Sequence, residues 1–411
     1  MIHILHTADW HLGQTFFGYD RTQEHEHFLD WLSNELHENE VNVLIIAGDV
    51  FDVSNPSAAS QRMFYRFLNR VTTENPLLQV VVVAGNHDSA ARLEAPIPLL
   101  QEMRTEIRGI VHKSDGEIDY DHLILDLKNA DGEVEALCLA VPFLRQGDYP
   151  VVETQGNPYA EGVKLLYTKL LERALGCKKN EQAIIAVGHL QATGSEIAEK
   201  DYSERTVIGG LECISPDAFP EQIAYTALGH IHKSQRVSGR DNVRYAGSPL
   251  PMSFAEKNYR HGVVMVTIDN GQVIDLEKKE YEPLMRLISI PAGQPASPEE
   301  VLKELIDLEL PENECFPYLE VKVLLTGPEP MLRQQIEEAL ANKPIRLARI
   351  VSAYRQTDES SLEEEVLAAG LQEMTPLQIV KAAFENTYQS EMPDDLLELF
   401  QEACLGVTLE E

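Results

Sequence analysis

The sequence predicts an α/β protein whose core is built from two packed sheets with helices on the outside. Two observations lead to this prediction. Residues 1–90 alternate between short apolar runs and helical spacing, a βαβαβ order typical of strands buried beneath helices. Residues 109–280 carry mostly short strand-like runs, which fit a second sheet packed on the first.

The first 90 residues contain three apolar runs separated by two amphipathic segments. The expected strands are Ile2–His6, Val41–Ala47 and Gln79–Ala84. The first helix is indicated by apolar residues at helical spacing, namely Phe28, Leu29, Leu32 and Leu36. Pro56 is expected in the first turn of the second helix. Its apolar stripe comprises Phe64, Phe67, Leu68 and Val71.

The middle of the chain is richer in strand signals than in helix signals. The expected strands are Leu123–Leu127, Glu135–Val141, Ala183–Val187, Ala224–Leu228, Val243–Ala246 and Gly262–Ile268. Residues 160–175 form the best helical pattern in this part. These runs would supply the second sheet and a helix that covers it.

A change of composition predicts a domain boundary near residue 284. Four prolines and a glycine lie between Tyr281 and Pro298, and we divide the chain into domains at 1–283, 284–356 and 357–411. The middle domain is expected to be a small α+β unit. Ser297 and Glu300 predict a capping box for a helix that ends near Asp307. Its other expected elements are a strand at Tyr318–Leu325, a helix at 329–341 and a strand at Ile345–Ala353.

The last segment is strongly acidic. Residues 359–411 carry 13 acidic side chains and one basic one, Lys381. Thr375–Gln378 fits a second capping box, and two short apolar faces follow, formed by Leu377, Val380 and Phe384 and by Leu396, Leu397 and Phe400. This tail is either a solvated end or a pair of helices that dock on a partner, and we favour docking.

Composition limits the function classes. The 411 residues carry a formal charge of −33, which argues against a protein that holds nucleic acid by bulk positive charge. Bound dications would supply positive charge locally. The amino terminus lacks a secretory pattern, and the five cysteines are scattered, so we expect a cytoplasmic protein with reduced thiols. No GxxxxGK[ST] motif occurs, so any ATP dependence would come from another subunit.

Metal-capable side chains follow the predicted strands. They are Asp9 and His11, Asp49 and Asp52, Asn86, His87 and Asp88, His189, and His230 and His232. Taken alone, Asp9 and His11 are more often turn and capping residues, GDVFD could be an acidic turn, and GHIH could be two loop histidines, but five such groups in this order are hard to explain without a metal. The carboxyl ends of strands converge in α/β folds, so we expect one shared site.

The donor types favour manganese or iron(II), with magnesium or zinc as alternatives. There are enough ligands for two metals, an arrangement suited to phosphoester hydrolysis. Asp49 is our choice for the carboxylate that bridges them. His87 is the predicted general acid. Asp88 is expected either to orient His87 or to cap the following helix.

The pattern DWH…GDVFD…GNHD…GH…GHIH resembles the calcineurin-like metallophosphoesterase superfamily, and within it the Mre-type break-repair nucleases. The resemblance implies a four-layer α/β/β/α sandwich with a capping domain. It also implies a first metal held by Asp9, His11, Asp49 and His232, and a second held by Asp49, Asn86, His189 and His230. His87 would be the catalytic histidine. Archaeal and eukaryotic relatives carry a second catalytic histidine where this chain has Asp52.

The same resemblance implies a nuclease subunit with ATP-dependent double-strand 3′–5′ exonuclease and hairpin endonuclease activity, in DNA repair, recombination and replication. Its partners would be DNA, a coiled-coil ATPase bound through the tail, and a second copy of the chain, giving a heterotetramer. Met63 and Tyr65 would contribute to the homodimer, or simply pack on their own sheet. The alternatives are a small-molecule phosphodiesterase or phosphatase and a non-catalytic scaffold.

Overall fold

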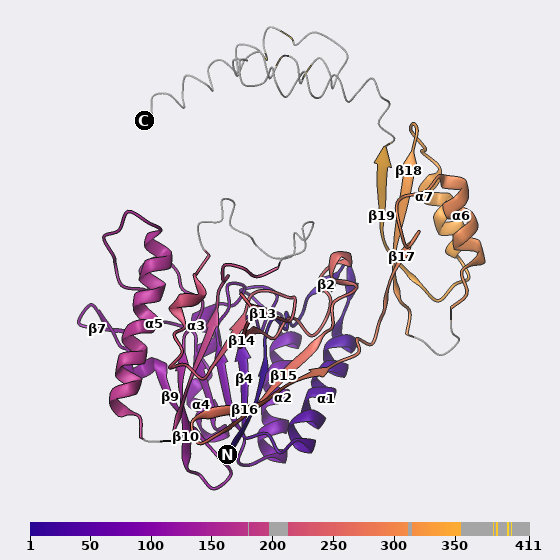
Figure 1. The fold of residues 1–411 in the computed structure, drawn as a ribbon. Coiled ribbons are helices and arrows are strands. Elements are labelled where there is room, and N and C mark those ends of the chain that lie inside the picture. The colour runs from indigo at the N-terminus through magenta and orange to yellow at the C-terminus, as the bar shows by residue number, and fades with distance from the viewer. Residues whose placement is uncertain are drawn as a thin grey trace.

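The computed structural model describes residues 1–179, 181–196, 213–310 and 315–354, together with Lys381, Phe384, Pro393 and Leu396. Two six-stranded sheets form the larger part of the molecule, and a three-stranded sheet with its helices stands beside them (Figure 1). The fold class is therefore the predicted one, an α/β arrangement with two mixed sheets followed by a smaller β/α region.

The first sheet is formed mainly by the amino-terminal part of the chain. In spatial order its strands are β16 (Gln272–Glu280), β15 (Gly262–Asp269), β1 (Ile2–Thr7), β4 (Val43–Ala47), β5 (Gln79–Val83) and β6 (Thr105–Arg108). The last four are parallel, whereas β15 and β16 are antiparallel. Because β1, β4, β5 and β6 are parallel, their carboxyl ends lie at the same edge of the sheet.

The second sheet has the same size and a related order. Its strands are β13 (Gln235–Val237), β14 (Arg240–Tyr245), β12 (Tyr225–Gly229), β11 (Ala183–His189), β10 (Val134–Ala140) and β9 (Ile124–Lys128). The four central strands are parallel. Two hairpins lie outside the sheets, namely β2 (Thr15–Phe16) with β3 (Tyr19–Asp20) and β7 (Lys113–Ser114) with β8 (Glu117–Ile118).

Three apolar clusters hold the four layers together. One lies between the first sheet and helices α1 (Thr22–Glu38) and α2 (Ala58–Glu74). A second joins the second sheet to α5 (Pro158–Cys177). The third lies between the two sheets, where Ile4, Ile45 and Ile185 are fully buried. The layer order is therefore helix, sheet, sheet, helix, as the resemblance implies.

The β/α region packs two helices on one face of a parallel sheet. Its strands are β17 (Leu287–Ile290), β18 (Tyr318–Leu325) and β19 (Arg346–Tyr354), and its helices are α6 (Pro298–Asp307) and α7 (Leu332–Leu340). The predicted capping box at Ser297 and Glu300 is present. A smaller cluster of Phe16, Phe254, Met285 and Tyr318 joins this region to the rest of the molecule.

Several details differ from the sequence predictions. Pro56 lies outside α2, because Ser57 is the N-cap and accepts a hydrogen bond from the Ser60 N–H. Strands β6, β13, β16 and β17 and the short helices α3 (Ala90–Glu94) and α4 (Ile97–Leu100) were not predicted. Strand β16 escapes prediction because five of its nine residues are charged, as befits an edge strand.

The tail predictions lie outside the described residues, apart from the isolated Lys381, Phe384, Pro393 and Leu396. The domain limits remain predictions. Within the described ranges, no helix combines the length and the apolar character that membrane crossing requires.

Candidate metal centre

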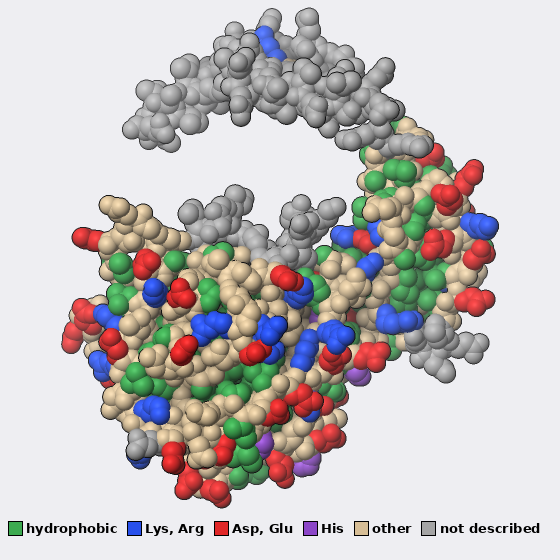
Figure 2. Space-filling view, in the orientation of Figure 1, with side chains coloured by type: hydrophobic (Ala, Val, Ile, Leu, Met, Phe, Trp, Pro, Cys, Tyr) green, Lys and Arg blue, Asp and Glu red, His purple; other side chains and the backbone are tan. Residues whose placement is uncertain are grey.

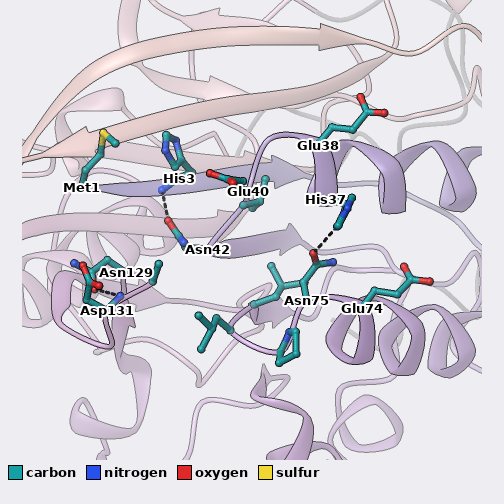
Figure 3. A pocket seen from close by; sticks show the side chains of 15 residues that line it. Met1, His3, His37, Glu38, Glu40, Asn42, Glu74, Asn75, Asn129 and Asp131 are labelled. Atoms are coloured by element: carbon teal, nitrogen blue, oxygen red, sulfur yellow. Dashed lines mark hydrogen bonds between the residues drawn. The ribbon is translucent and has the colours of Figure 1, made fainter.

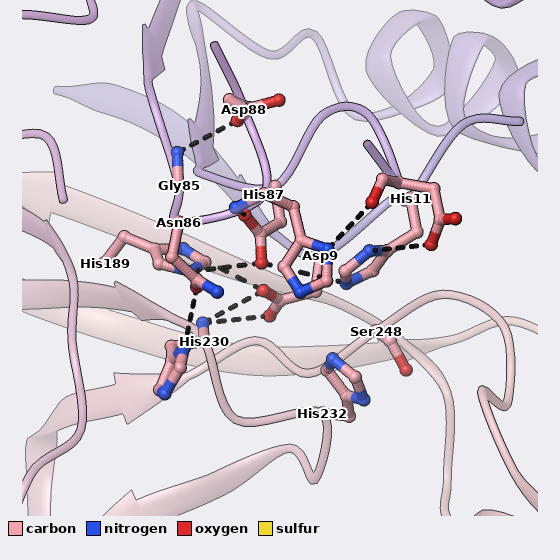
Figure 4. Close-up of polar contacts among 12 residues, drawn as sticks. Asp9, His11, Gly85, Asn86, His87, Asp88, His189, His230, His232 and Ser248 are labelled. Carbon is pink, nitrogen blue, oxygen red and sulfur yellow. Dashed lines mark hydrogen bonds and ion pairs between the residues drawn. The ribbon is translucent and has the colours of Figure 1, made fainter. Parts of the chain in front are cut away.

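The seven predicted metal ligands lie together at the carboxyl ends of strands from both sheets (Figure 4). From the first sheet, Asp9 and His11 follow β1, Asp49 follows β4 and Asn86 follows β5. From the second sheet, His189 ends β11, and His230 and His232 follow β12. The convergence predicted from the strand ends is thus found.

Asp49 lies at the centre of the cluster. Its Oδ2 lies 3.2 Å from His189 Nε2 and 3.8 Å from His11 Nε2. Asn86 Oδ1 lies 2.9 Å from His189 Nε2 and 3.0 Å from His230 Nδ1. The Asp49 carboxylate therefore faces one imidazole that follows a strand of the first sheet and one that ends a strand of the second sheet, which is the geometry expected of a bridging residue.

Among the residues that the structure describes, three groups of three side chains have ligand atoms within 4.8 Å of one another. They are Asp9, His11 and His232; Asp9, Asp49 and His189; and His11, Asp52 and His87. Both ring nitrogens of His11 are buried and have no hydrogen-bond partner among the residues that the structure describes. Atoms that bind one dication at about 2.0–2.2 Å lie about 3–3.5 Å apart, close to the separations found around Asp49. Orphaned buried nitrogens beside carboxylates are costly unless a cation satisfies them, so these residues fit divalent metals.

The backbone of the cluster is held in an unfavourable conformation. Asp9, His11, Asp49 and His230 have φ angles of 55°, 46°, 48° and 101°. Such left-handed backbone costs on the order of 1–3 kcal/mol for each non-glycine residue, and it persists at sites where the surroundings fix it. Close approach also requires glycine, because a Cβ at Gly85 would lie 2.1 Å from Asp49 Oδ1.

Hydrogen bonds at Nδ1 set the orientation of two imidazole rings in the cluster, those of His189 and His232. His189 Nδ1 lies 2.9 Å from the Ala47 carbonyl oxygen, so it carries the proton and Nε2 faces Asp49. His232 Nδ1 lies 2.9 Å from Glu256 Oε1. Glu256 was missed in the sequence because it follows no predicted strand.

The electrostatics of the cluster favour a positive charge at its centre. Burial disfavours protonated His189, but the Asp49 and Asp9 carboxylates raise its pKa to about 9. Burial acts against the ionised Asp49, yet His189 and His11 hold its pKa below the usual range. Burial, followed by the charge of His189, lowers the pKa of His230 to about 3. The site thus combines one ionised carboxylate with a neutral imidazole ready to act as a ligand.

His87 and Asp88 differ in their surroundings. His87 Nδ1 lies 2.8 Å from the Asp52 carbonyl oxygen, and its ring packs against that of His11 at 4.8 Å. The prediction that Asp88 orients His87 or caps the next helix is wrong. Its carboxylate accepts hydrogen bonds from the backbone N–H groups of Gly85, Val50 and Phe51, so it joins the two ligand loops.

Several polar and basic side chains near the cluster are engaged in other contacts. Ser248 is buried and donates its hydroxyl to the Leu250 carbonyl, which supports an ordinary turn at Gly247–Pro249. Arg236 and Lys233 pair with Asp241 and Glu196. Figure 2 shows Lys and Arg side chains gathered over the middle of the drawn face, where the β/α region meets the sheets.

A surface hollow of about 950 Å³ lies at the other end of the first sheet (Figure 3). Its lining includes His3 at the start of β1 and Asn42 just before β4. These are the amino ends of the strands, opposite to the ligand cluster. In α/β folds reactive groups gather at the carboxyl ends, so the functional site is the cluster and not this hollow.

Comparisons with known proteins identify the family of this chain. Residues 2–234 match the family of calcineurin-like phosphoesterases, and residues 283–388 match SbcD_C, the type 5 capsule protein repressor C-terminal domain. The SbcD subunit of the nuclease SbcCD from Rhodobacter capsulatus is 35% identical over 86% of this chain and 88% of its own. Escherichia coli SbcD is 30% identical over 89% of each chain. Bacillus subtilis SbcD is 31% identical over 66% of this chain and 67% of its own. The chain therefore belongs to the calcineurin-like phosphoesterases and, among them, to the SbcD family of nuclease subunits.

Proposed function

We propose that this chain is the nuclease subunit of an SbcCD-like complex and hydrolyses DNA phosphodiester bonds at a two-metal centre. The observation that carries the proposal is the position of Asp49, between ligand side chains that come from both sheets. Family membership supports the substrate class, because the relatives that the chain matches over most of its length are named nuclease subunits. The expected substrates are DNA ends and hairpins.

We assign the first metal to Asp9, His11, Asp49 and His232, and the second to Asp49, Asn86, His189 and His230. The short separations around Asp49 and Asn86 support this division. Bound divalent metals supply positive charge that polarises the phosphodiester and lowers the pKa of water. The mixture of carboxylate, amide and imidazole donors favours Mn²⁺ over Zn²⁺, which prefers fewer ligands, and over Mg²⁺, which prefers oxygen.

His87 is the proposed proton donor to the leaving oxygen. Its Nδ1 is held by the Asp52 carbonyl, which leaves Nε2 for the substrate. Burial, only partly offset by Asp49, lowers the pKa of His87 and makes its protonated form a stronger acid. Asp88 acts through the loops that carry Asp49 and Asn86, so its role is positioning.

The proposed arrangement of domains and partners is the one that family membership implies. Domain 1–283 would carry the chemistry, domain 284–356 would cap it, and the acidic tail 357–411 would bind an SbcC-like coiled-coil ATPase in the cytoplasm. Two copies would pair through α2, where Met63 and Tyr65 are half-buried on its surface. DNA affinity would come from the metals, from exposed basic groups such as Arg92, and from the partner.

Cleavage of a labelled DNA hairpin in Mn²⁺ tests this proposal, with a cyclic nucleotide and a phosphopeptide as competing substrates. We expect preferential cleavage of the hairpin, with ATP dependence when the ATPase is added. His112→Ala is a matched control, because that histidine is half-exposed and remote from the ligands. Faster turnover of the cyclic nucleotide or the phosphopeptide would contradict a nuclease function.

A further inference from the structure

Glu256 is a fully buried carboxylate beside the metal ligands, in the turn that follows Ser253. One oxygen lies 2.9 Å from His232 Nδ1, and the other accepts a hydrogen bond of 2.9 Å from the Met252 N–H. A buried carboxylate is costly unless its oxygens are bonded, and these two contacts bond both oxygens of Glu256. The side chain is therefore fixed from one end by backbone and meets the imidazole at the other.

The contact with Glu256 determines which ring nitrogen of His232 can bind a metal. An Nδ1–H that donates to a carboxylate leaves the lone pair on Nε2 and makes that nitrogen a stronger donor toward a metal. His189 shows the contrast, because its Nδ1 lies against the neutral carbonyl of Ala47. The donor strength of Nε2 therefore differs between the two imidazoles, because His232 donates to a charged carboxylate and His189 to a neutral carbonyl.

The turn that carries Glu256 is also held by the β/α region. The Phe254 ring lies beneath the Arg349 guanidinium at 5.3 Å, and Lys257 Nζ donates to Ser289 Oγ at 3.1 Å. Ser289 and Arg349 both bond to Glu320, at 3.0 Å and 2.6 Å. The turn is therefore contacted from β17 by Ser289 and from β19 by Arg349, and Glu320 of β18 bonds to both of these residues.

We propose that Glu256 is a positioning residue that orients His232 for the first metal, and that the turn Ser253–Lys257 makes this metal's affinity depend on the β/α region. The inference rests on the assignment of His232 as a ligand of that metal. It adds a route by which a change in the β/α region alters the metal centre without touching a ligand.

The first test is Mn²⁺ binding by the full-length Glu256→Gln variant, followed by electron paramagnetic resonance. We expect one site to keep its affinity and the other to weaken by about 10–100-fold, the usual effect of losing such a partner. At two equivalents of Mn²⁺, wild-type protein would show the coupled signal of a metal pair, whereas the variant would show isolated ions. Glu280→Gln is the control, since that exposed side chain pairs only with Arg260 among the residues described. Wild-type binding by Glu256→Gln would overturn the proposal.

Two further variants keep this result interpretable. His232→Ala should weaken the same site, and if it does not, the ligand assignment fails rather than the role of Glu256. Glu256→Asp keeps the charge but is too short to hold both contacts, so it should also weaken one site. Thermal unfolding of the metal-free proteins checks that each variant is folded.

The dependence on the β/α region is tested with Arg349→Met, which removes the charge above Phe254 and keeps an apolar stem. We expect the affinity of the same site to fall by about 3-fold or more, within the range of coupling between distant sites. Arg333→Met on α7 is the control, because Arg333 is exposed and pairs with Glu337 on its own helix. Equal Mn²⁺ affinity in Arg349→Met and Arg333→Met would refute the coupling.

Discussion

His189 and Asp49 belong to different sheets, yet their side chains lie 3.2 Å apart. His189 ends β11 in the second sheet, and Asp49 follows β4 in the first. Side chains from the two sheets meet only because the apolar cluster between the sheets aligns their carboxyl edges. Packing of the two sheets is therefore a condition for assembling the ligands.

Asp49→Ala should abolish metal binding at both sites. This carboxylate faces ligands of each proposed metal, and its removal leaves the neighbouring imidazoles without a negative partner. Elemental analysis of dialysed protein measures the effect. Asp121→Ala is the control, because Asp121 is exposed and pairs with Arg173 far from the cluster. Full metal content in Asp49→Ala would exclude a bridging role.

His87→Ala should retain both metals and lose cleavage. The imidazole is held by the Asp52 carbonyl, and removing a proton donor typically costs about 10²–10⁴-fold in rate. Parallel measurements of manganese content and hairpin cleavage separate the two effects. A variant that cleaves at the wild-type rate would show that the proton comes from elsewhere.

Stability should fall as the pH drops below about 6.5, the ordinary pKa of histidine. Burial lowers the pKa of His6 and His25 to about 3, and of His261 to about 4. Between those values and pH 6.5 the unfolded chain binds more protons than the folded one. Each group therefore lowers the free energy of unfolding by about 1.4 kcal/mol for every unit by which the pH falls.

His25 offers the sharpest check of this pH dependence, since neither of its ring nitrogens has a hydrogen-bond partner in the described part of the chain. His25→Leu should reduce the slope of unfolding free energy against pH between about 4 and 6 by one proton. Urea unfolding at a series of pH values measures it. An unchanged slope in His25→Leu would mean that His25 titrates normally.

Tyr318→Phe should weaken the junction between the β/α region and the sheets. The Tyr318 hydroxyl donates to Glu24 Oε2 at 2.9 Å, and Glu24 is a buried carboxylate that also pairs with Arg21. Loss of a hydrogen bond to a buried charge costs about 1.5–3 kcal/mol. Thermal unfolding compares this variant with Tyr354→Phe, whose side chain is exposed. Equal stability of the two would mean that this bond contributes nothing.

Deletion of residues 357–411 should leave hydrolysis of a model phosphodiester intact and abolish co-purification with the ATPase. The proposed ligands all lie before residue 233, so the tail supplies none of them. Pull-down with the ATPase, together with turnover of a chromogenic diester, measures both properties. Retained co-purification would place the partner contact elsewhere on the chain.

The loops that meet at the cluster could be recognised in the sequence, because each follows an apolar run. Asp9, Asn86 and His189 could be placed from that rule alone. The role of Asp88 was misjudged for a different reason. A carboxylate next to a histidine suggests that the two side chains interact, whereas the oxygens of Asp88 accept hydrogen bonds from backbone N–H groups of two loops. Only the tertiary structure shows where those N–H groups lie.

Other features had no signal in the sequence. Glu256 lies in a single 3₁₀ turn, and its partner His232 is far enough away along the chain that no spacing rule connects them. Strand β17 is too short and too close to prolines to stand out. Interactions that depend on the packing of distant segments were therefore missed, whereas local strand and cap patterns, such as Ser297 and Glu300, were found.

Anomalous scattering from crystals grown with Mn²⁺ tests the central assignment most directly. The account predicts two peaks that share Asp49, one bounded by Asp9, His11 and His232 and the other by Asn86, His189 and His230. A single peak, or peaks that leave Asp49 without a metal contact, would contradict it.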